Sequence, residues 1–247
     1  MTRDRLRLFN VLMGGLHAVQ GFVVLLIAND FALPVTSTFM EGPPGESPPV
    51  LRTVFEVRFA WWVAAFLFLS AAAHWIIASP KVYDWYRENL KRERNYARWI
   101  EYSVSSSIMI VLIAMLTGIS EVTAIFALFA VNAAMILFGL LQEHYETPGN
   151  GRWLPYWFGV LAGAVPWILI GYYLVSPGIA AQPPTFVYVI FITLFIFFNS
   201  FAVNMVLQYR KVGKWADYEY GEKVYVFLSL TAKTLLAWQV FGGTLAT

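Results

Sequence analysis

The chain has 247 residues, of which 59% are apolar and only 13% are charged, and its formal net charge is +2. Soluble domains carry about 25% charged residues, so this composition excludes a soluble globular protein and indicates an integral membrane protein. The chain has no cysteine, which excludes disulfides and thiol chemistry. A short basic segment precedes the first apolar run, but no small-residue cleavage site follows it, and we expect that run to be a retained helix.

The apolar residues gather in seven segments, each about as long as a helix that crosses a bilayer. Such a helix needs about 20 predominantly apolar residues. Prolines and glycines mark most of the joints between the segments, where helices end. We therefore predict an all-α membrane protein, a bundle of seven transmembrane helices that forms a single domain over residues 1–247. The predicted spans are 8–28, 57–78, 95–117, 120–142, 155–175, 184–208 and 222–243.

Lysines and arginines are distributed unevenly between the two sides of this predicted bundle. The side that holds the N-terminal segment carries fourteen of them, whereas the other side carries only Arg52 and Arg58. Because cytoplasmic loops are enriched in these residues, we predict a multi-pass protein of the cell membrane with a cytoplasmic N-terminus and an extracellular C-terminus. The fourteen residues are Arg3, Arg5, Arg7, Lys81, Arg87, Lys91, Arg92, Arg94, Arg98, Arg152, Arg210, Lys211, Lys214 and Lys223.

Lys233 stands near the middle of the last predicted span, ten residues beyond Lys223 and ten before Gly243. A charge at the centre of a membrane helix costs at least about 2.5–3.5 kcal/mol, so this lysine needs a partner or a function. Two interpretations stay open. The lysine could face a wet cavity or a structural partner, or it could hold a cofactor covalently as a Schiff base, because a desolvated amine is a good nucleophile.

Glu101 is the best candidate for the partner of Lys233. The tip of Lys233 leans back toward the start of its helix, to a level ~9 Å from Lys223 at 1.5 Å per residue. By the same rise Glu101 lies ~10 Å beyond Arg94, so the two groups can meet at one depth in the cytoplasmic half of the bundle. The alternative is an interfacial glutamate paired with Arg98 or Lys91.

Two of the three histidines fall near the same depth. His17 in the first span and His74 in the second both lie in the predicted cytoplasmic half. Each alone could be a hydrogen-bonding partner between helices, but together they suggest a polar pocket able to hold water or a proton. His144 is expected to be solvated in a loop. No spacing of histidines or carboxylates favours a metal site.

Two short motifs resemble those of the microbial rhodopsins, which bind retinal on a lysine of the last helix. Arg98-Trp-Ile-Glu-Tyr102 resembles their third-helix Arg-x-x-Asp-Trp pattern, with glutamate in place of aspartate. Ser229-Leu-Thr-Ala-Lys233 departs from their usual Asp-x-x-x-Lys, because a serine replaces the carboxylate. The reversed topology, the single glutamate and the histidines of the first two spans resemble the heliorhodopsins over the whole chain.

This resemblance implies a role for each candidate residue. Lys233 would carry all-trans retinal as a protonated Schiff base, with Glu101 as its counterion. Ser229 and Ser106 would hydrogen bond around that pair. Ordinary packing is the alternative for the wall residues. The implied retinal wall is Met109, Asn132, Trp167 and Phe198, and the implied hydrated cytoplasmic-side cavity is lined by His17, His74 and Gln20.

The resemblance also implies a light-sensing photoreceptor, not an enzyme, that moves no net ions. Glu101, His17 and His74 all lie on the cytoplasmic side, so a released proton could return from the side on which it left. The connection at about residues 29–56, which its composition leaves as either a lid or an exposed loop, would form a β-hairpin lid. A homodimer and an unknown cytoplasmic signalling partner are implied, and no nucleic acid. The alternatives are a light-driven ion pump or channel, and a seven-helix transporter or membrane enzyme without retinal.

Overall fold

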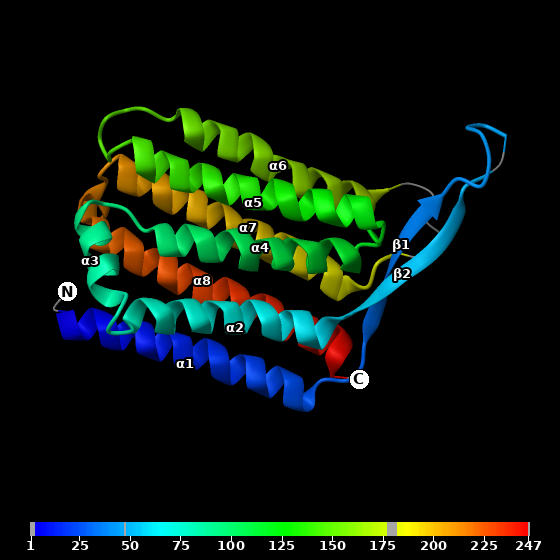
Figure 1. Ribbon diagram of the computed structural model, residues 1–247, viewed down its shortest axis with the longest axis horizontal. Coiled ribbons are helices and arrows are strands. Elements are labelled where there is room, and N and C mark those ends of the chain that lie inside the picture. Colours follow the sequence, from blue (N-terminus) through cyan, green and yellow to red (C-terminus); the bar gives the residue numbers. More distant parts are fainter. Residues whose placement is uncertain (1–2, 47, 177–181, 247) are drawn as a thin grey trace.

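Seven long helices lie side by side along the long axis of the protein (Figure 1). The computed structural model describes residues 3–46, 48–176 and 182–246. All seven helices are long and apolar enough to cross a membrane, which confirms the predicted all-α seven-helix membrane bundle. They are α1 (Arg3–Ile27), α2 (Phe59–Ala78), α4 (Tyr96–Leu116), α5 (Val122–Tyr145), α6 (Leu154–Val175), α7 (Thr185–Tyr209) and α8 (Tyr218–Val240).

The helix boundaries differ from the prediction mainly at three helix ends. The largest difference is at α1, which begins at Arg3, five residues before the predicted start. The predicted fourth span stops at residue 142, but α5 continues to Tyr145 because Gln142 and Glu143 are buried and hydrogen-bonded inside the protein. His144 therefore lies in the last helical turn and not in a loop, although it is exposed as expected. The last helix starts at Tyr218, four residues earlier than predicted.

The connection between α2 and α4 contains a short helix that hydropathy did not predict, α3 (Tyr83–Lys91). Its apolar side packs against the bundle through Tyr83, Tyr86 and Leu90, in a cluster with Tyr218. Two further short elements flank α8, the 3₁₀ turn η1 (Gly213–Ala216) and the π-helical turn η2 (Phe241–Leu245).

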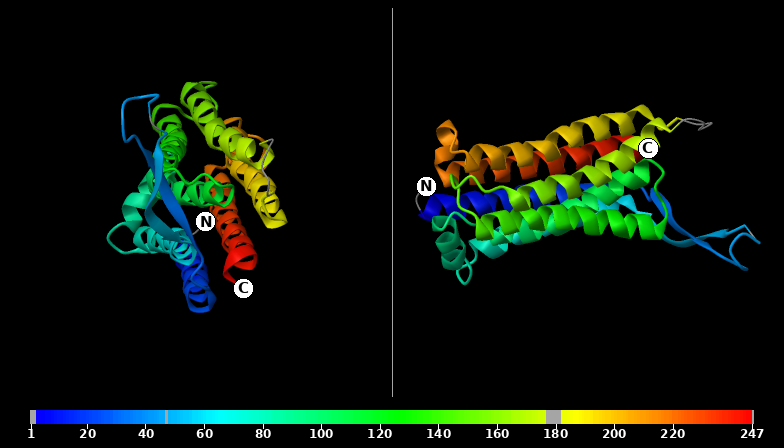
Figure 2. Two further views of the ribbon diagram at one scale, coloured as in Figure 1. Left: turned by 90° about the vertical axis from the view of Figure 1, so that its right-hand side faces the viewer. Right: turned by 90° about the horizontal axis from the view of Figure 1, so that it is seen from above.

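The long first connection forms an antiparallel hairpin of β1 (Ala32–Phe39) and β2 (Val50–Arg58), as the resemblance implied. A bulge between Val35 and Thr36 interrupts the register. The Thr36 amide donates to the Ser120 carbonyl over 2.8 Å, which fixes the hairpin to the segment before α5. Figure 2 shows the hairpin passing over the ends of α4 and α5, with its tip beyond the bundle and the ends of α7 and α8 uncovered.

The two ends of the bundle carry different elements, and we name them accordingly. The basic end holds the N-terminus, α3 and η1, and the hairpin end holds β1, β2 and the C-terminus (Figure 1). Large apolar side chains remain exposed along the sides of the helices, among them Leu26, Trp61 and Phe126. Such surfaces suit a bilayer, because the main-chain hydrogen bonds of a helix are made within it and its apolar side chains can meet the lipid.

Candidate functional site

The amine of Lys233 and the carboxylate of Glu101 meet inside the bundle. The Lys233 Nζ lies 3.1 Å from Glu101 Oε1 and 3.4 Å from Oε2. Both side chains are largely buried, with 4% and 9% of their areas exposed. The Lys233 amine also donates to the Ser229 hydroxyl one turn earlier, over 2.9 Å. The buried cation therefore has the carboxylate partner that its burial requires.

Two neighbours of this pair escaped the sequence analysis. The Ser70 hydroxyl of α2 donates to Glu101 Oε1 over 2.6 Å, and the Tyr102 ring centroid lies 4.9 Å from Lys233 Nζ. Ser70 precedes His74 by one helical turn, so the two lie on one face of α2. The spacing of four residues between Ser70 and the intramembrane His74 was the sequence signal that could have identified Ser70.

His17 of α1 and His74 of α2 lie against each other, as the polar pocket hypothesis required. Their ring centroids are 5.8 Å apart and the rings are nearly parallel. His74 Nδ1 hydrogen bonds to Asn10 Oδ1 over 2.9 Å. His17 is fully buried, and neither ring nitrogen has a hydrogen-bond partner among the described residues. A buried imidazole without such a partner suits a bound water, which can make the missing hydrogen bonds.

Gln20 does not join these histidines through its own hydrogen bonds. Its amide nitrogen donates to the Leu16 carbonyl, and its amide oxygen accepts from the Trp238 indole over 3.2 Å. Gln20 therefore fixes α1 to α8, one helical turn toward the hairpin end from His17.

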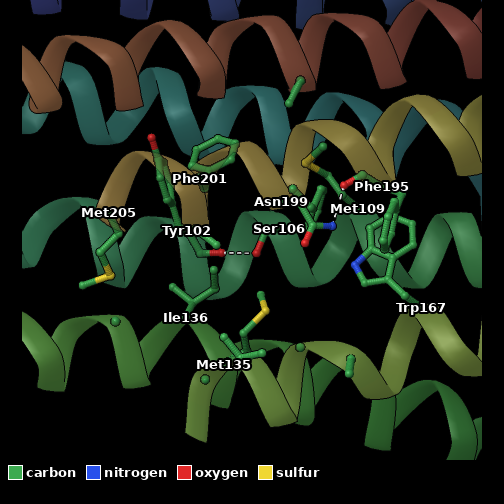
Figure 3. A pocket seen from close by; sticks show the side chains of 18 of the residues that line it. Tyr102, Ser106, Met109, Met135, Ile136, Trp167, Phe195, Asn199, Phe201 and Met205 are labelled. Atoms are coloured by element: carbon green, nitrogen blue, oxygen red, sulfur yellow. Dashed lines mark hydrogen bonds between the residues drawn. The ribbon is translucent and has the colours of Figure 1, made fainter. Parts of the chain in front are cut away.

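An apolar cavity of about 460 Å³ lies beside Lys233, bordered by α4, α5, α6, α7 and α8 (Figure 3). This volume falls within the range of about 300–1,000 Å³ that small-ligand sites occupy. Trp167 packs edge-on against Phe191, Phe195 and Phe198, with ring centroids 5.4–5.6 Å apart. The candidate residues Ser106, Met109, Trp167, Phe198, Ser229 and Lys233 all line this cavity.

Asn132 supports the cavity wall from behind. It lies outside the lining, and its amide donates to the hydroxyls of Ser106 and Ser107 over 2.9 and 3.0 Å. Asn132 is 1% exposed, so these bonds satisfy an otherwise isolated buried amide. Asn132 therefore acts on the cavity indirectly, through its hydrogen bond to Ser106.

Glycines that the sequence analysis left unassigned bring the wall helices close together. A Cβ on Gly139 of α5 would lie 2.4 Å from the Trp99 ring, and one on Gly163 of α6 would lie 2.5 Å from Met135 Sδ. Small residues permit such close approach of membrane helices. Gly159 and Gly163, spaced by four on one predicted span, were the signal available in the sequence.

A second buried charge cluster joins α4, α5 and α8 nearer the basic end. Arg98 pairs with Glu143 through one terminal nitrogen and with Glu222 through the other. Its guanidinium also lies 3.9 Å from the Tyr225 ring centroid. These contacts show that the alternative pairing of Glu101 with Arg98 is wrong. Hydropathy could not reveal the cluster, because each charge stands alone near the end of its own span.

The fold and the Lys233 site together define a rhodopsin-type membrane protein. Five of the seven helices that are able to span a membrane border an apolar cavity, and the cavity wall presents a buried amine beside a carboxylate. Comparison with protein families sharpens this class: the heliorhodopsin model matches residues 6–245, and the chain belongs to the heliorhodopsin family. The match confirms the resemblance to the heliorhodopsins that the sequence indicated. No curated protein sequence matches the chain.

The residues of the site fit the cofactor that the family implies, retinal. The long apolar polyene of retinal suits the aromatic cavity. The aldehyde of retinal can form an imine only with an amine that reaches this cavity. Lys233 meets that requirement because it lines the cavity. In the described part of the chain, no group of three or more acidic or histidine side chains is arranged to hold a metal ion.

Proposed function

We propose that this protein senses light through all-trans retinal held as a protonated Schiff base on Lys233, with Glu101 as the counterion. The observation that carries the proposal is the 3.1 Å contact between these two groups at the edge of the apolar cavity. A buried lysine left without its carboxylate would be strongly destabilising. Retinal, when bound, supplies absorption of visible light and a double bond that isomerises.

The surrounding side chains orient the pair. Ser229 accepts a hydrogen bond from the Lys233 nitrogen, and Ser70 donates one to Glu101, so the carboxylate keeps its negative charge facing the amine. The Ser106 hydroxyl, which accepts a hydrogen bond from the Asn132 amide, is a polar group further along the cavity wall. Met109, Trp167 and Phe198 exclude water from the polyene region.

The distribution of titratable groups supports sensing without net ion transport. Beyond Glu101 and Lys233, toward the hairpin end, α4 and α8 carry no acidic, basic or histidine side chain. A pump needs a proton acceptor and a donor on opposite sides of the reacting group. His17 and His74 also interact electrostatically with Lys233.

The proposal includes an orientation and partners. The basic end faces the cytoplasm, because its exposed lysines and arginines follow the positive-inside rule. The protein forms a homodimer in the bilayer, as the family resemblance implies, and signals to an unidentified partner at the basic end. Exposed Lys81, Lys91 and Arg92, in α3 or next to it, offer that partner a charged surface.

Absorption spectroscopy tests the proposal. Full-length protein purified with and without all-trans retinal should differ by a visible band that bleaches with hydroxylamine, which attacks the imine. A preparation that takes up no retinal would refute the proposed function and favour a seven-helix transporter.

A further inference from the structure

A patch of cations lies where the connection from α5 to α6 meets the end of α7, at the basic end of the bundle (Figure 1). Each of its four side chains is exposed, and none forms a salt bridge or a side-chain hydrogen bond with another described residue. By contrast, Lys91 and Arg92 beside α3 both pair with Glu88. We call the four residues the basic patch: Arg152, Arg210, Lys211 and Lys214.

Main-chain contacts bring the two segments of the basic patch together. The Gly149 amide donates to the Tyr209 carbonyl at the end of α7 over 2.9 Å. Gly149 has a φ of 96°, and a Cβ there would lie 3.5 Å from Lys211 Cε, so Lys211 lies against this turn. Arg152 follows Gly149 by three residues, which an extended chain spans in about 10 Å. Its carbonyl accepts from the buried Gln142 side chain over 2.8 Å, which fixes the connection to α5.

The two acidic side chains of these connections are engaged elsewhere. Glu146 accepts a hydrogen bond from the Asn150 side chain over 2.6 Å. Asp217 accepts one from the Glu219 backbone amide over 3.0 Å, where it caps the start of α8. The cations of the basic patch therefore lie close together without a carboxylate partner among the described residues. Because like charges repel one another, a bound anion would stabilise this arrangement.

An exposed apolar strip on α6 begins directly beside the basic patch. Leu154, Trp157 and Leu161 are 66%, 62% and 69% exposed. Their spacing of three and four residues places them on one face of a helix that is able to span a membrane. Tryptophan near the end of such a helix is typical of the membrane–water interface. A soluble acidic partner would satisfy the charges alone, whereas an anionic phospholipid satisfies both the charges and the apolar strip.

We propose that the basic patch and this apolar strip bind an anionic phospholipid from the leaflet at the basic end. The lipid phosphate accepts hydrogen bonds from Arg152, Arg210 and Lys211, and an acyl chain lies along the exposed face of α6. Guanidinium groups suit this role because they bind phosphate through two parallel hydrogen bonds. Anionic lipids are found in the cytoplasmic leaflet, which agrees with the proposed orientation. The inference does not involve retinal and goes beyond the proposed light sensing.

Native mass spectrometry of the full-length protein in detergent tests the inference. Phosphatidylglycerol and phosphatidylcholine with the same acyl chains are added in equal amounts, and wild type should retain the phosphatidylglycerol. Each cation near an anionic lipid surface contributes about fivefold in affinity, so the triple variant Arg152→Gln, Arg210→Gln, Lys211→Gln should lose on the order of a hundredfold. The matched control removes the same charge at the same end and should bind as wild type does. It combines Lys81→Gln, Lys91→Gln and Arg92→Gln.

Two further measurements identify the ligand and exclude misfolding. Arg210→Lys combined with Lys211→Arg keeps both charges and should retain the lipid. Glycerol 3-phosphate, which has the phosphate but no acyl chain, should not displace it at equal concentration.

Four results would each overturn the inference. They are equal retention of the two lipids by wild type, equal losses in the two triple variants, displacement by glycerol 3-phosphate, and binding of polyglutamate without any preference for phosphatidylglycerol. Displacement by glycerol 3-phosphate would assign the patch to a soluble phosphate, and the polyglutamate result would assign it to an acidic protein. A protein without a visible band can still give every one of these results, so failure of the proposed function is distinguishable.

Discussion

Glu101 and Lys233 stand 132 positions apart in the chain, and their charged groups lie 3.1 Å apart inside the bundle. Ser229 and Ser70 complete the polar shell of the pair from α8 and α2. On the hairpin-end side of this contact the walls are apolar and aromatic, whereas the basic-end side holds two histidines and a buried charge cluster. Polar and charged groups are therefore distributed unevenly around the contact between Lys233 and Glu101.

Replacing Lys233 should abolish retinal binding. Lys233→Ala removes the only amine that lines the cavity among the described residues, and no visible band should form on adding all-trans retinal. Since alanine leaves Glu101 buried without a partner, Lys233→Arg serves as a second variant: it keeps the positive charge but cannot form an imine. Lys214→Ala, at an exposed position before α8, is the matched control. A visible band retained in Lys233→Arg would assign the linkage to another group.

Neutralising Glu101 should change the colour of the pigment. Glu101→Gln removes the negative charge nearest the imine, so the band moves to longer wavelength while the imine stays protonated, or to the near ultraviolet if it loses its proton. Ser70→Ala removes one hydrogen bond to Glu101 but keeps the carboxylate, so its absorption band should shift less than that of Glu101→Gln. Absorption spectra across a pH series measure both. Spectra identical to wild type in Glu101→Gln would show that another group is the counterion.

Removing Arg98 should destabilise the fold without touching the Lys233 site. Arg98→Ala leaves two buried carboxylates facing each other without a cation, and loss of one partner from a buried pair costs about 3–5 kcal/mol. Thermal melting followed by loss of the visible band should show a large decrease in melting temperature. Arg152→Ala, exposed at the same end, should leave it unchanged. Equal melting of Arg98→Ala and wild type would contradict the cluster's structural role.

Glu121 should make the attachment of the hairpin dependent on pH. The Thr123 hydroxyl and the backbone amides that cap α5 lower the pKa of Glu121, and Ser37 of β1 also donates to it. A depressed folded-state pKa stabilises the protein above the unfolded-state pKa, and this contribution is lost as the pH falls through the folded value.

Glu121→Gln should therefore lower stability at neutral pH and match wild type in acid. Melting temperature and hydrogen exchange of the β1 amides, measured from neutral to acidic pH, test this difference. Glu46→Gln, at the exposed tip of the hairpin, is the control. A deficit of Glu121→Gln that persists unchanged at low pH would indicate that the charge is not responsible.

Illumination should move charge within the protein but produce no net ion transport. Proteoliposomes should show no lasting pH change sensitive to a protonophore and no steady photocurrent, because α4 and α8 carry no acidic, basic or histidine side chain between the Lys233 pair and the hairpin end. A well-characterised light-driven proton pump in the same liposomes serves as the positive control. A steady current that reverses with the ion gradient would make the protein a light-driven pump or channel.

Local composition determined the fold class and the number of spans. Each transmembrane helix satisfies its own backbone and needs only about 20 apolar residues, so hydropathy reveals it without knowledge of its neighbours. The end of α5 was missed because Glu143 reads as a loop residue, although it is buried in an ion pair. The start of α8 was missed because the four residues before Glu222 are polar or small and read as a loop. The helix α3 was missed because its short amphipathic sequence buries only Tyr83, Tyr86 and Leu90 against the bundle.

The sequence by itself also determined the Lys233 and Glu101 candidates, since depth along a helix follows from a fixed rise per residue and an intramembrane charge is conspicuous. It could not determine which helix faces turn toward one another, because that depends on packing between segments distant in the chain. Only the tertiary structure joined Ser70 to Glu101, linked Gln20 to Trp238 and paired Arg98 with Glu143 and Glu222. The basic patch likewise forms only where the turn at Gly149 meets the end of α7.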